Sequence, residues 1–568
     1  MLNAPNINLA WTMLAAEECH RLGVRHAVVS PGSRSAPLAV AFARHRGITV
    51  HIAHDERGGA FLALGLAKQS GVPAVAIMTS GTAVANALPA VVEARMTRTP
   101  LLVFAADRPP ELRDCGANQA IPQSSLLDGA VRWSVDLPCP TQDVPAEFVL
   151  STVDEAHARA CGLAGSQGGG VHVNWQFREP LAPEARPWDV GWLWSVARWS
   201  KDRARRPWRT SIAAPASEIV VQSGVVIAGR APVTMRASLA RWKGTLLADV
   251  TSGLARGGTA GADLVLRSAF DGDNRALLKE LEPSEIVVAG DAVVSKRMHA
   301  WIAQHKGPVT VVGPGDPRVD PSHRANTVVS GASAFVGAAG LRPHPAWRRA
   351  LTTATRAARK ALDGERVLCE PSALADTTEA CSEHAHGTIF YGSSMPIRDA
   401  DFLSIHPPRG WDVGSNRGAS GIDGLVATAT GHALASALPV VAFIGDVSAL
   451  HDLNSLQLAS KVQTPLVLVV LNNDGGGIFR YLPIARHADV FEQCFVTPHG
   501  RAIAPFAKAF GIASESPTTR AAMSKSVAKA LRRAGATLLE VTCTRESSET
   551  MRTRVATAAM AALAQDFH

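Results

Sequence analysis

The segment 445-GDVSALHDLNSLQLASKVQTPLVLVVLNN-473 decides the fold class, because it contains an apolar strand, a helix and a second apolar strand in succession. The first strand ends at Asp446, the helix is marked by leucines three residues apart, and the second strand ends at Asn473. Parallel strands joined through a helix bring their carboxyl ends to one edge of a sheet, where open α/β sheets bind their ligands. We therefore expect an α/β protein with a site that includes Asp446 and Asn473.

The same alternation of strands and helices extends over the rest of the chain. Toward the N-terminus the expected strands are 26–30, 48–56, 73–80, 99–107 and 171–175. Toward the C-terminus they are 388–394, 438–446, 464–473 and 536–543. A weaker set lies between them, at 223–230, 285–295 and 307–316. Near-continuous apolar strands of this kind indicate parallel sheets covered by helices on both faces.

The length of 568 residues also favours several domains, since a single hydrophobic core stops growing well below that size. We expect three α/β domains at 1–185, 213–345 and 346–568, joined by a linker at 186–212. Five of the twelve tryptophans and many arginines fall in that linker, which invites a nucleic-acid interpretation through stacking and phosphate contacts. Tryptophans that pack on neighbouring domains explain the segment equally well, and we expect no nucleic-acid partner.

Composition describes an ordinary globular protein. The formal charge of +8 is spread along the chain and suits small acidic substrates at least as well as nucleic acid. The eight cysteines form no CxxC pair, as expected of reduced thiols in a reducing compartment. The N-terminus lacks the apolar core of a signal peptide, and apolar runs such as 466-LVLVVL-471 are shorter than the roughly 20 residues that span a bilayer. We expect a soluble, cytoplasmic protein with no membrane span.

Asp446 and Asn473 have the chemistry of a metal and diphosphate site. The helix that starts after Asp446 presents backbone N–H groups and a dipole that favour a phosphate. A carboxylate, an amide oxygen and a diphosphate together form an oxygen cage suited to Mg²⁺. A Gly-Asp pair after a strand is also a common turn and helix cap. The 27-residue separation of Asp446 from Asn473, each at a strand end, favours the functional interpretation.

This spacing resembles the thiamine-diphosphate motif of the decarboxylase-like enzymes. The resemblance implies a thiamine-diphosphate-enzyme architecture in which Asp446, Asn473 and the carbonyl group of Gly475 bind Mg²⁺ or Mn²⁺. Val447 stands where that motif often has glycine. Such enzymes also need a carboxylate on the aminopyrimidine ring, in the other terminal domain, to promote the imino tautomer of the ring. Glu56, at the end of the expected strand 48–56, is the candidate, although a glutamate at a strand end is usually only solvated.

Several further stretches resemble one family over essentially the whole chain. They are 30-SPGSRSAPLA-39, 54-HDERGGAF-61, 79-TSGTAVANALPAVVEA-94, 107-DRPPELRDCGANQAI-121, 176-QFREPL-181 and 414-GSNRGASGIDG-424. Together with the diphosphate motif they resemble the 2-succinyl-5-enolpyruvyl-6-hydroxy-3-cyclohexene-1-carboxylate synthases of menaquinone biosynthesis. Acetolactate synthases and pyruvate decarboxylases share the cofactor, but SPGSRSAPL and SNRGASGIDG are not patterns associated with them.

The resemblance implies a transferase that forms a carbon–carbon bond. It would decarboxylate 2-oxoglutarate and add the remaining fragment to isochorismate, as a homodimer or a dimer of dimers in which the Glu56 domain and the diphosphate domain meet across a subunit interface. Both substrates are dicarboxylates, which favours arginine because its guanidinium binds a carboxylate through two parallel hydrogen bonds.

The same resemblance assigns the remaining site residues. It implies a catalytic role for Glu56. It implies cofactor contacts for Glu56, Thr79, Gly81, Ile422, Asp446, Ser448, Asn473, Gly475 and Ile478, with Ile422 holding the cofactor in its bent form. It implies substrate contacts for Ser33, Arg34, Arg108, Asn118, Gln119, Lys296, Arg297, Ser394, Arg398, Arg417 and Phe479.

Two other interpretations stay open on the sequence alone. One is another thiamine-diphosphate enzyme that acts on a small 2-oxo acid, and the other is a non-catalytic relative that retains the fold. A nucleotide-dependent oxidoreductase is disfavoured, because no GxGxxG motif follows the first expected strand.

Overall fold

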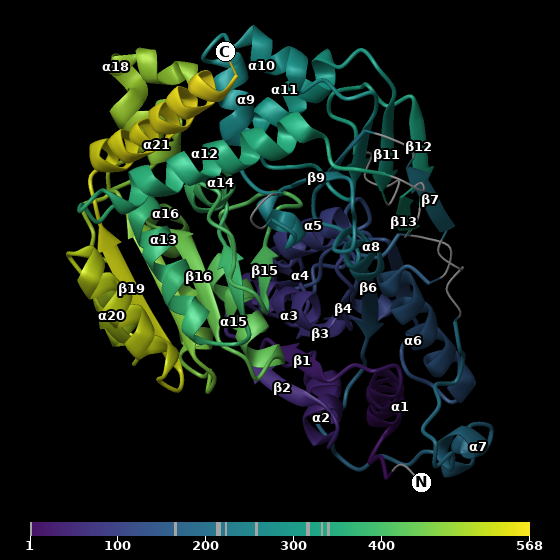
Figure 1. Ribbon diagram of the computed structural model, residues 1–568. Helices are drawn as coiled ribbons and strands as arrows, with labels where there is room; N and C mark the ends of the chain where they lie inside the picture. Colours follow the sequence, from purple (N-terminus) through teal and green to yellow (C-terminus); the bar gives the residue numbers. More distant parts are fainter. Residues whose placement is uncertain are drawn as a thin grey trace. The chain divides into compact units, whose positions relative to one another are not determined.

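The computed structural model (Figure 1) describes residues 3–163, 167–211, 217–221, 224–255, 259–313, 319–330, 333–337 and 341–567. The chain divides into two compact units. The first unit comprises residues 1–214, 416–437 and 451–462, and the second comprises residues 215–415, 438–450 and 463–568. No described helix is both long enough and apolar enough to cross a membrane.

A six-stranded parallel sheet forms the centre of the first unit, with strand order β2-β1-β3-β4-β6-β5. Its strands are β1 (His26–Val29), β2 (Thr49–Ile52), β3 (Ala74–Met78), β4 (Leu101–Asp107), β5 (Trp133–Leu137) and β6 (Gly170–Gln176). The central strands β3, β4 and β6 are buried along their whole length, as their unbroken apolar sequences predict.

Helices cover both faces of this sheet (Figure 1). One face packs against α1 (Ile7–Arg21), α2 (Ala36–Arg44) and α6 (Ala146–Cys161). The other packs against α3 (Glu56–Ser70), α5 (Leu88–Thr97) and α15 (Leu425–Ala435). Helices α3 and α15 approach so closely that a Cβ atom on Gly65 would lie 2.2 Å from the carbonyl oxygen of Thr428.

The expected strand 48–56 is wrong at its C-terminal end. Strand β2 stops at Ile52, and Glu56 is the first residue of helix α3. The reason is the N-cap: the carboxylate of Asp55 accepts hydrogen bonds from the backbone N–H groups of Arg57 (2.9 Å) and Gly58 (3.4 Å). Glu56 is therefore presented by the N-terminus of a helix.

The tryptophan-rich linker lies against the first unit through part of its length, in η2 (Val190–Trp194) and α7 (Ala197–Ser200). Trp192 stacks on Trp11 of α1 with ring centroids 6.3 Å apart. Trp199 is buried, and its indole N–H donates to the carboxylate of Glu18 (2.7 Å). Trp194 is instead 75% exposed.

The described residues of the second unit form three parallel sheets. A six-stranded sheet has the order β15-β14-β16-β17-β19-β18, a five-stranded sheet has the order β12-β11-β10-β8-β9, and β13 pairs with β7. The first sheet consists of β14 (Gly387–Tyr391), β15 (Trp411–Ser415), β16 (Val440–Gly445), β17 (Leu466–Asn472), β18 (Ala513–Glu515) and β19 (Ala536–Thr542). The others consist of β7 (Ser217–Val221), β8 (Val225–Ala228), β9 (Thr245–Ala248), β10 (Ile286–Ala289), β11 (Val309–Gly313), β12 (Thr327–Ser330) and β13 (Ser333–Gly337).

Positions 223 and 314–316 of the expected strands lie outside the described residues. The expected domain boundaries stay a prediction.

A large hydrophobic core in the second unit includes helices from its whole length, and a smaller cluster lies around β8, β9 and α8 (Val233–Leu239). The helices of the large core are α9 (Ala262–Phe270), α10 (Arg275–Glu280), α11 (Lys296–Gln304), α12 (Pro345–Asp363), α13 (Glu370–Ala380), α14 (Met395–Phe402), α20 (Arg520–Leu531) and α21 (Arg545–Asp566). The long helix α21 packs against α12 and α9 (Figure 1).

The single helix expected after Asp446 is also wrong. The segment forms three short pieces, α16 (Asp446–His451), η5 (Leu453–Ser455) and α17 (Leu456–Ala459). The break lies at Asp452, which is buried and accepts hydrogen bonds from the backbone N–H of Ala427 (3.0 Å) and the hydroxyl of Ser455 (2.7 Å). These contacts compete with the regular hydrogen bonds of a helix.

Candidate active site

Asp446 lies at the carboxyl end of β16 and is only 3% exposed. Its Oδ1 accepts the backbone N–H of Val447 (2.7 Å) and its Oδ2 accepts that of Gly475 (2.9 Å). The Nε2 atom of His499 is 3.2 Å from Oδ2. Burial raises the pKa of Asp446, while the two N–H donors oppose that shift. A buried carboxylate held by N–H groups keeps lone pairs free to bind a cation.

Asn473 follows the neighbouring strand β17 and is also buried. Its Nδ2 donates to Oε1 of Glu370 at 2.6 Å, while its Oδ1 has no hydrogen-bond partner among the described residues. Leaving a buried acceptor unpaired costs roughly 1–3 kcal/mol. A cation bound by Oδ1 removes that cost, so this orphaned oxygen fits a metal ligand.

Gly475 completes the expected ligand set. Its φ is +123°, and a Cβ atom there would lie 2.1 Å from the carbonyl oxygen of Val496, so only glycine fits. The loop is fastened by Asp474, whose Oδ1 accepts the N–H groups of His499 (2.9 Å) and Gly500 (2.7 Å). A carboxylate, an amide oxygen and a backbone carbonyl are hard oxygen donors, which suit Mg²⁺ or Mn²⁺.

The described residues contain no cluster of three or more His, Cys, Asp or Glu side chains that could hold a metal. The proposed ligands include only one such side chain, Asp446, so oxygens of a bound diphosphate would have to complete the coordination. Nearby, Ser448 is buried in α16. Ile478 and Phe479 lie half-buried in η6 (Gly477–Tyr481), where the Phe479 ring packs edge-on against Phe495 at 5.6 Å.

Glu56, in the first unit, is half-buried. Its Oε2 lies 3.4 Å from the donor Nδ2 of Asn86, at the long limit of a hydrogen bond. Asp55, not Glu56, caps the helix. The carboxylate of Glu56 is therefore largely free to contact a ligand.

Two arginines of the first unit form a cationic site. Arg108 is 8% exposed, and its Nη1 donates to the hydroxyl of Ser80. The Nη1 of Arg34 donates to the carbonyl of Phe177 (2.9 Å), and its Nε is buried with no hydrogen-bond partner in the described part of the chain. Burial, together with the charge of Arg34, lowers the pKa of Arg108.

Carboxylates compensate these two charges poorly. Asp107, next to Arg108, accepts instead from Nη2 of Arg113 (2.7 Å). Arg34 is 3.6 Å from Glu179, whose side chain is 71% exposed. Neighbouring guanidinium groups whose side chains form no ion pair with a buried carboxylate among the described residues favour the binding of an anion.

The turn at the end of β3 lies beside these arginines. A Cβ atom on Gly32 would lie 2.4 Å from Cβ of Thr79, so the loop before α2 packs on this turn. Gln119 donates to the carbonyl of Ser80 (2.8 Å), and the hydroxyl of Ser80 donates back to the carbonyl of Gln119 (3.0 Å). The structure thus brings together the segments that carry these expected residues: Ser33, Arg34, Thr79, Gly81, Arg108, Asn118 and Gln119.

Arg417 and Ile422 lie in the segment that precedes α15, and both are half-buried. Glu93 anchors this segment to α5, because its carboxylate accepts the backbone N–H groups of Gly418 (3.2 Å) and Ala419 (2.7 Å). The position of the segment in the first unit is therefore fixed by a buried carboxylate.

Ser394 and Arg398 lie in one turn of the second unit. Ser394 has a φ of +75° and precedes α14, and Nη1 of Arg398 donates to its carbonyl oxygen (2.6 Å). Lys296 is exposed at the first position of α11. The adjacent Arg297 forms ion pairs with Asp271 (2.6 Å) and Asp263 (3.4 Å), so its charge is already compensated.

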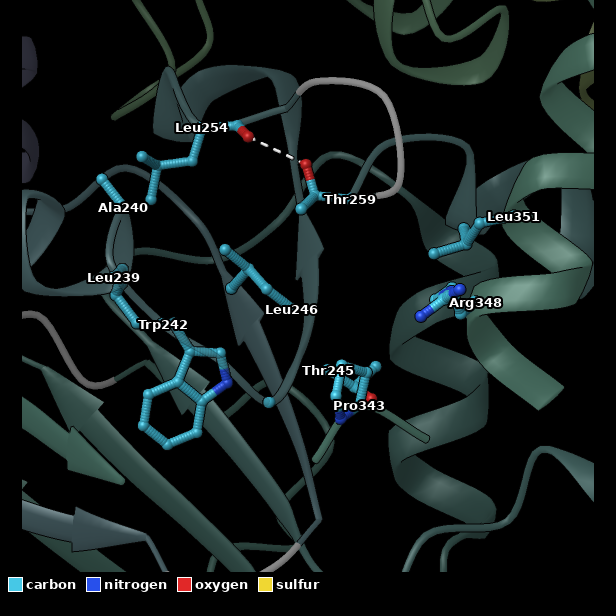
Figure 2. A pocket seen from close by; sticks show the side chains of 11 residues that line it. Leu239, Ala240, Trp242, Thr245, Leu246, Leu254, Thr259, Pro343, Arg348 and Leu351 are labelled. Atoms are coloured by element: carbon cyan, nitrogen blue, oxygen red, sulfur yellow. Dashed lines mark hydrogen bonds between the residues drawn. The ribbon is translucent and has the colours of Figure 1, made fainter. Parts of the chain in front are cut away.

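A separate pocket beside β9 contains none of the expected residues (Figure 2). Its walls are mostly apolar side chains, among them Leu239, Trp242, Leu246 and Leu254, and Arg348 contributes a charge.

Sequence reasoning missed two buried residues that contact this site, Glu370 and Arg552. Glu370 binds Asn473 directly, and Arg552 binds Glu370. The only sequence signal for Arg552 is its place on the apolar stripe of α21, beside Met551 and Val555.

Three sequence families match the chain. Residues 12–127 match "Thiamine pyrophosphate enzyme, N-terminal TPP binding domain", residues 190–377 match "Middle domain of thiamine pyrophosphate", and residues 394–541 match "Thiamine pyrophosphate enzyme, C-terminal TPP binding domain".

Several curated relatives are similar to the chain over almost their whole length. A 2-succinyl-5-enolpyruvyl-6-hydroxy-3-cyclohexene-1-carboxylate synthase of Aeromonas salmonicida is 39% identical over 551 residues, covering 93% of each chain. Proteins of the same name from Rubrobacter xylanophilus and Salinibacter ruber are each 38% identical, and the alignments cover 96% and 98% of this chain and 97% of each relative.

Proposed function

Since this chain belongs to the 2-succinyl-5-enolpyruvyl-6-hydroxy-3-cyclohexene-1-carboxylate synthase family of thiamine pyrophosphate enzymes, we propose that it performs the reaction for which that family is named. It decarboxylates 2-oxoglutarate and adds the remaining fragment to isochorismate, a step of menaquinone biosynthesis. The observation that carries the proposal is the buried pair formed by Asp446 and the orphaned amide oxygen of Asn473.

Thiamine diphosphate is the cofactor that the matched domains bind. When bound, it supplies the electron sink for the loss of carbon dioxide and the formation of the new bond. Asp446, Asn473 and the carbonyl of Gly475 hold Mg²⁺ or Mn²⁺ in this proposal. Glu56 holds a proton at the aminopyrimidine ring, and Ile422, Ile478 and Phe479 exclude water from the reacting atoms.

Arg34 and Arg108 are the best supported groups for a substrate carboxylate, because neither side chain forms an ion pair with a buried carboxylate among the described residues. The other substrate residues named from the sequence stay in the proposal. Arg297 is the least favourable of them, since its guanidinium is already paired with two aspartates.

Arg108→Gln should lower kcat/KM for a dicarboxylate substrate by about 10–100-fold, because a charge-assisted hydrogen bond contributes roughly 1.5–3 kcal/mol. The measurement is kcat/KM for 2-oxoglutarate and for isochorismate, each with the other saturating. Arg21→Gln is the control: Arg21 is another buried arginine of the first unit, and its partners Glu17 and Trp199 are not site residues. A change below threefold for both substrates would remove Arg108 from the site.

The assembly is proposed to be at least a homodimer, because the family resemblance assigns Glu56 and the diphosphate site to different subunits. Activity should then fall with dilution into the range where the chains separate. Analytical ultracentrifugation alongside rate measurements checks this, and a fully active monomer would contradict it.

A cytoplasmic location is also part of the proposal. All eight cysteines are free thiols, and Cys19, Cys139, Cys369 and Cys381 are buried. Free thiols are the usual state in a reducing compartment.

The test of the proposed function is direct. Purified protein is incubated with thiamine diphosphate, Mg²⁺, 2-oxoglutarate and isochorismate, and the product is identified by its mass. A parallel reaction replaces 2-oxoglutarate with pyruvate. Turnover with pyruvate alone would identify a different 2-oxo acid enzyme, and no turnover with either would contradict the proposal.

A further inference from the structure

A buried carboxylate fixes the orientation of the Asn473 amide. Glu370 is the first residue of α13, and its Oε1 accepts Nδ2 of Asn473 at 2.6 Å. A carboxylate can only accept hydrogen bonds, so it selects the amide nitrogen and leaves Oδ1 unpaired. Among the contacts described for the Asn473 side chain, the hydrogen bond to Glu370 is the one that distinguishes its Nδ2 atom from its Oδ1 atom.

Glu370 is itself held by an arginine. Its Oε2 accepts from Nη2 of Arg552 at 2.5 Å, and the same guanidinium binds both oxygens of Asp399 at 2.7 and 2.6 Å. The side chains of Arg552, Glu370 and Asp399 are 8%, 4% and 2% exposed. Burial alone would lower the pKa of Arg552, but the charges of Asp399 and Glu370 keep it well above its ordinary value.

Two buried carboxylates share the guanidinium of Arg552 in this network. Burial raises the pKa of one of them, Asp399, while the charges of Arg552 and Arg398 oppose that shift. A buried charge is costly unless it is paired and hydrogen-bonded. Glu370 meets that condition through Arg552 on one side and the Asn473 amide on the other. Donation from the amide to a carboxylate also makes its oxygen a stronger metal ligand.

Arg552 connects three segments that carry expected site residues. Through Glu370 it reaches Asn473, and through Asp399 it reaches α14, which begins after Ser394. Its Nη1 donates to the hydroxyl of Tyr481 (2.9 Å), which ends the η6 segment of Ile478 and Phe479. A purely structural ion pair would have no reason to end on the amide nitrogen of Asn473, whose side-chain oxygen is buried without a partner among the described residues.

We propose that Glu370, held by Arg552, is a positioning residue that orients and polarises the Asn473 amide and thereby sets the affinity of the cofactor's metal site. This inference rests on the proposed function, because it assumes that Asn473 binds the metal of a thiamine-diphosphate complex.

The test is the metal dependence of cofactor binding in Glu370→Gln. Binding of thiamine diphosphate is measured by calorimetry over a series of Mn²⁺ concentrations, without substrates. Outer-shell partners of metal ligands typically affect affinity by 10–100-fold, so the half-saturating Mn²⁺ concentration should rise by about that factor. Saturating Mn²⁺ should restore much of kcat, which separates positioning from a role in the chemical step.

Asp376→Asn is the matched control. Asp376 lies on the same helix, is buried, and pairs with Arg520 at 2.6 Å, but it contacts none of the expected site residues in the structure described. If Glu370 acted only through fold stability, both variants would lower the melting temperature and neither would change the metal dependence. The proposal requires the metal shift in Glu370→Gln alone.

Glu370→Asp is the second variant, in case Glu370→Gln does not fold. It keeps the charge beside Arg552, but it is one methylene shorter and cannot reach both Arg552 and Asn473. Its half-saturating Mn²⁺ concentration should rise at least threefold. A folded Glu370 variant with wild-type metal dependence would overturn the inference, whereas wild-type protein that binds the cofactor without any metal would overturn the proposed site itself.

Discussion

Asp446→Ala should abolish the binding of thiamine diphosphate rather than only slow the reaction. Asp446 supplies the only charged side chain among the proposed metal ligands, since Asn473 and Gly475 contribute neutral oxygens. Loss of an outer-shell partner already costs 10–100-fold in metal affinity, so loss of this ligand should cost more than about 100-fold. Calorimetry with thiamine diphosphate and Mg²⁺ measures the effect directly.

Thermal unfolding gives an independent measurement. A ligand at 100 times its Kd stabilises the folded state by about 2.7 kcal/mol, so wild-type protein should melt at a higher temperature when cofactor and metal are added. Asp446→Ala should show no such rise. Two effects on the protein without ligands oppose each other, because the substitution removes a carboxylate that burial disfavours but also takes the acceptor from the N–H groups of Val447 and Gly475. The rise on adding ligands, rather than the starting melting temperature, is therefore the quantity to compare.

The control for this variant is Asp474→Ala. Asp474 fastens the same loop through the N–H groups of His499 and Gly500, but its side chain is 47% exposed. If Asp446→Ala acted only by loosening this loop, Asp474→Ala would lower the affinity for thiamine diphosphate by a similar factor. Normal cofactor affinity in Asp446→Ala would rule out the metal site.

Strands that are buried on both faces were predictable, whereas of the four edge strands of the two six-stranded sheets only β2 was expected. Each strand missed in the two six-stranded sheets, β5, β15 and β18, is an edge strand. Residues in β5 and β18 are mostly half-buried and their sequences, WSVDL and ASE, mix polar with apolar positions. An edge strand has one neighbour and one open side, so its sequence carries a weaker apolar signal.

Local hydrogen bonds explain the two wrong boundaries. A run of apolar residues indicates where a strand begins, but Asp55 ends the extended segment by capping α3. Asp452 likewise interrupts the helix after Asp446 through its contact with Ala427, which is 25 residues earlier in the chain. Competition of this kind depends on partners that the local sequence does not reveal.

The residues of the candidate site also fall into two groups, those that the sequence predicts and those that it does not. Asp446 and Asn473 were predictable because strand ends place them at one edge of a sheet. Glu370 lies 103 residues from Asn473 and Arg552 lies 182 residues from Glu370. No periodicity or spacing connects residues so far apart, and a charged residue in a helix is ordinarily solvent-exposed. Their role became visible only from the contacts.

Glu56→Gln should lower kcat by about 10²–10⁴-fold, the usual contribution of a positioned proton-transfer group. The proposed role requires a group that holds a proton at the aminopyrimidine ring, and a neutral amide cannot accept that proton as a carboxylate does. Turnover is measured with both substrates, Mg²⁺ and cofactor at saturation.

The structure predicts that this loss will be separable from folding and from cofactor binding. Asp55 caps α3, so Glu56 can be replaced without removing the cap, and surface substitutions of this kind usually change stability by less than about 0.5 kcal/mol. The metal ligands in the second unit are unchanged. Asn86→Ala is the control, because it removes only the long 3.4 Å contact to Glu56 and should have a small effect. If folded, cofactor-saturated Glu56→Gln turned over at nearly the wild-type rate, a group other than Glu56 would have to hold the proton, and the proposed role of Glu56 would be wrong.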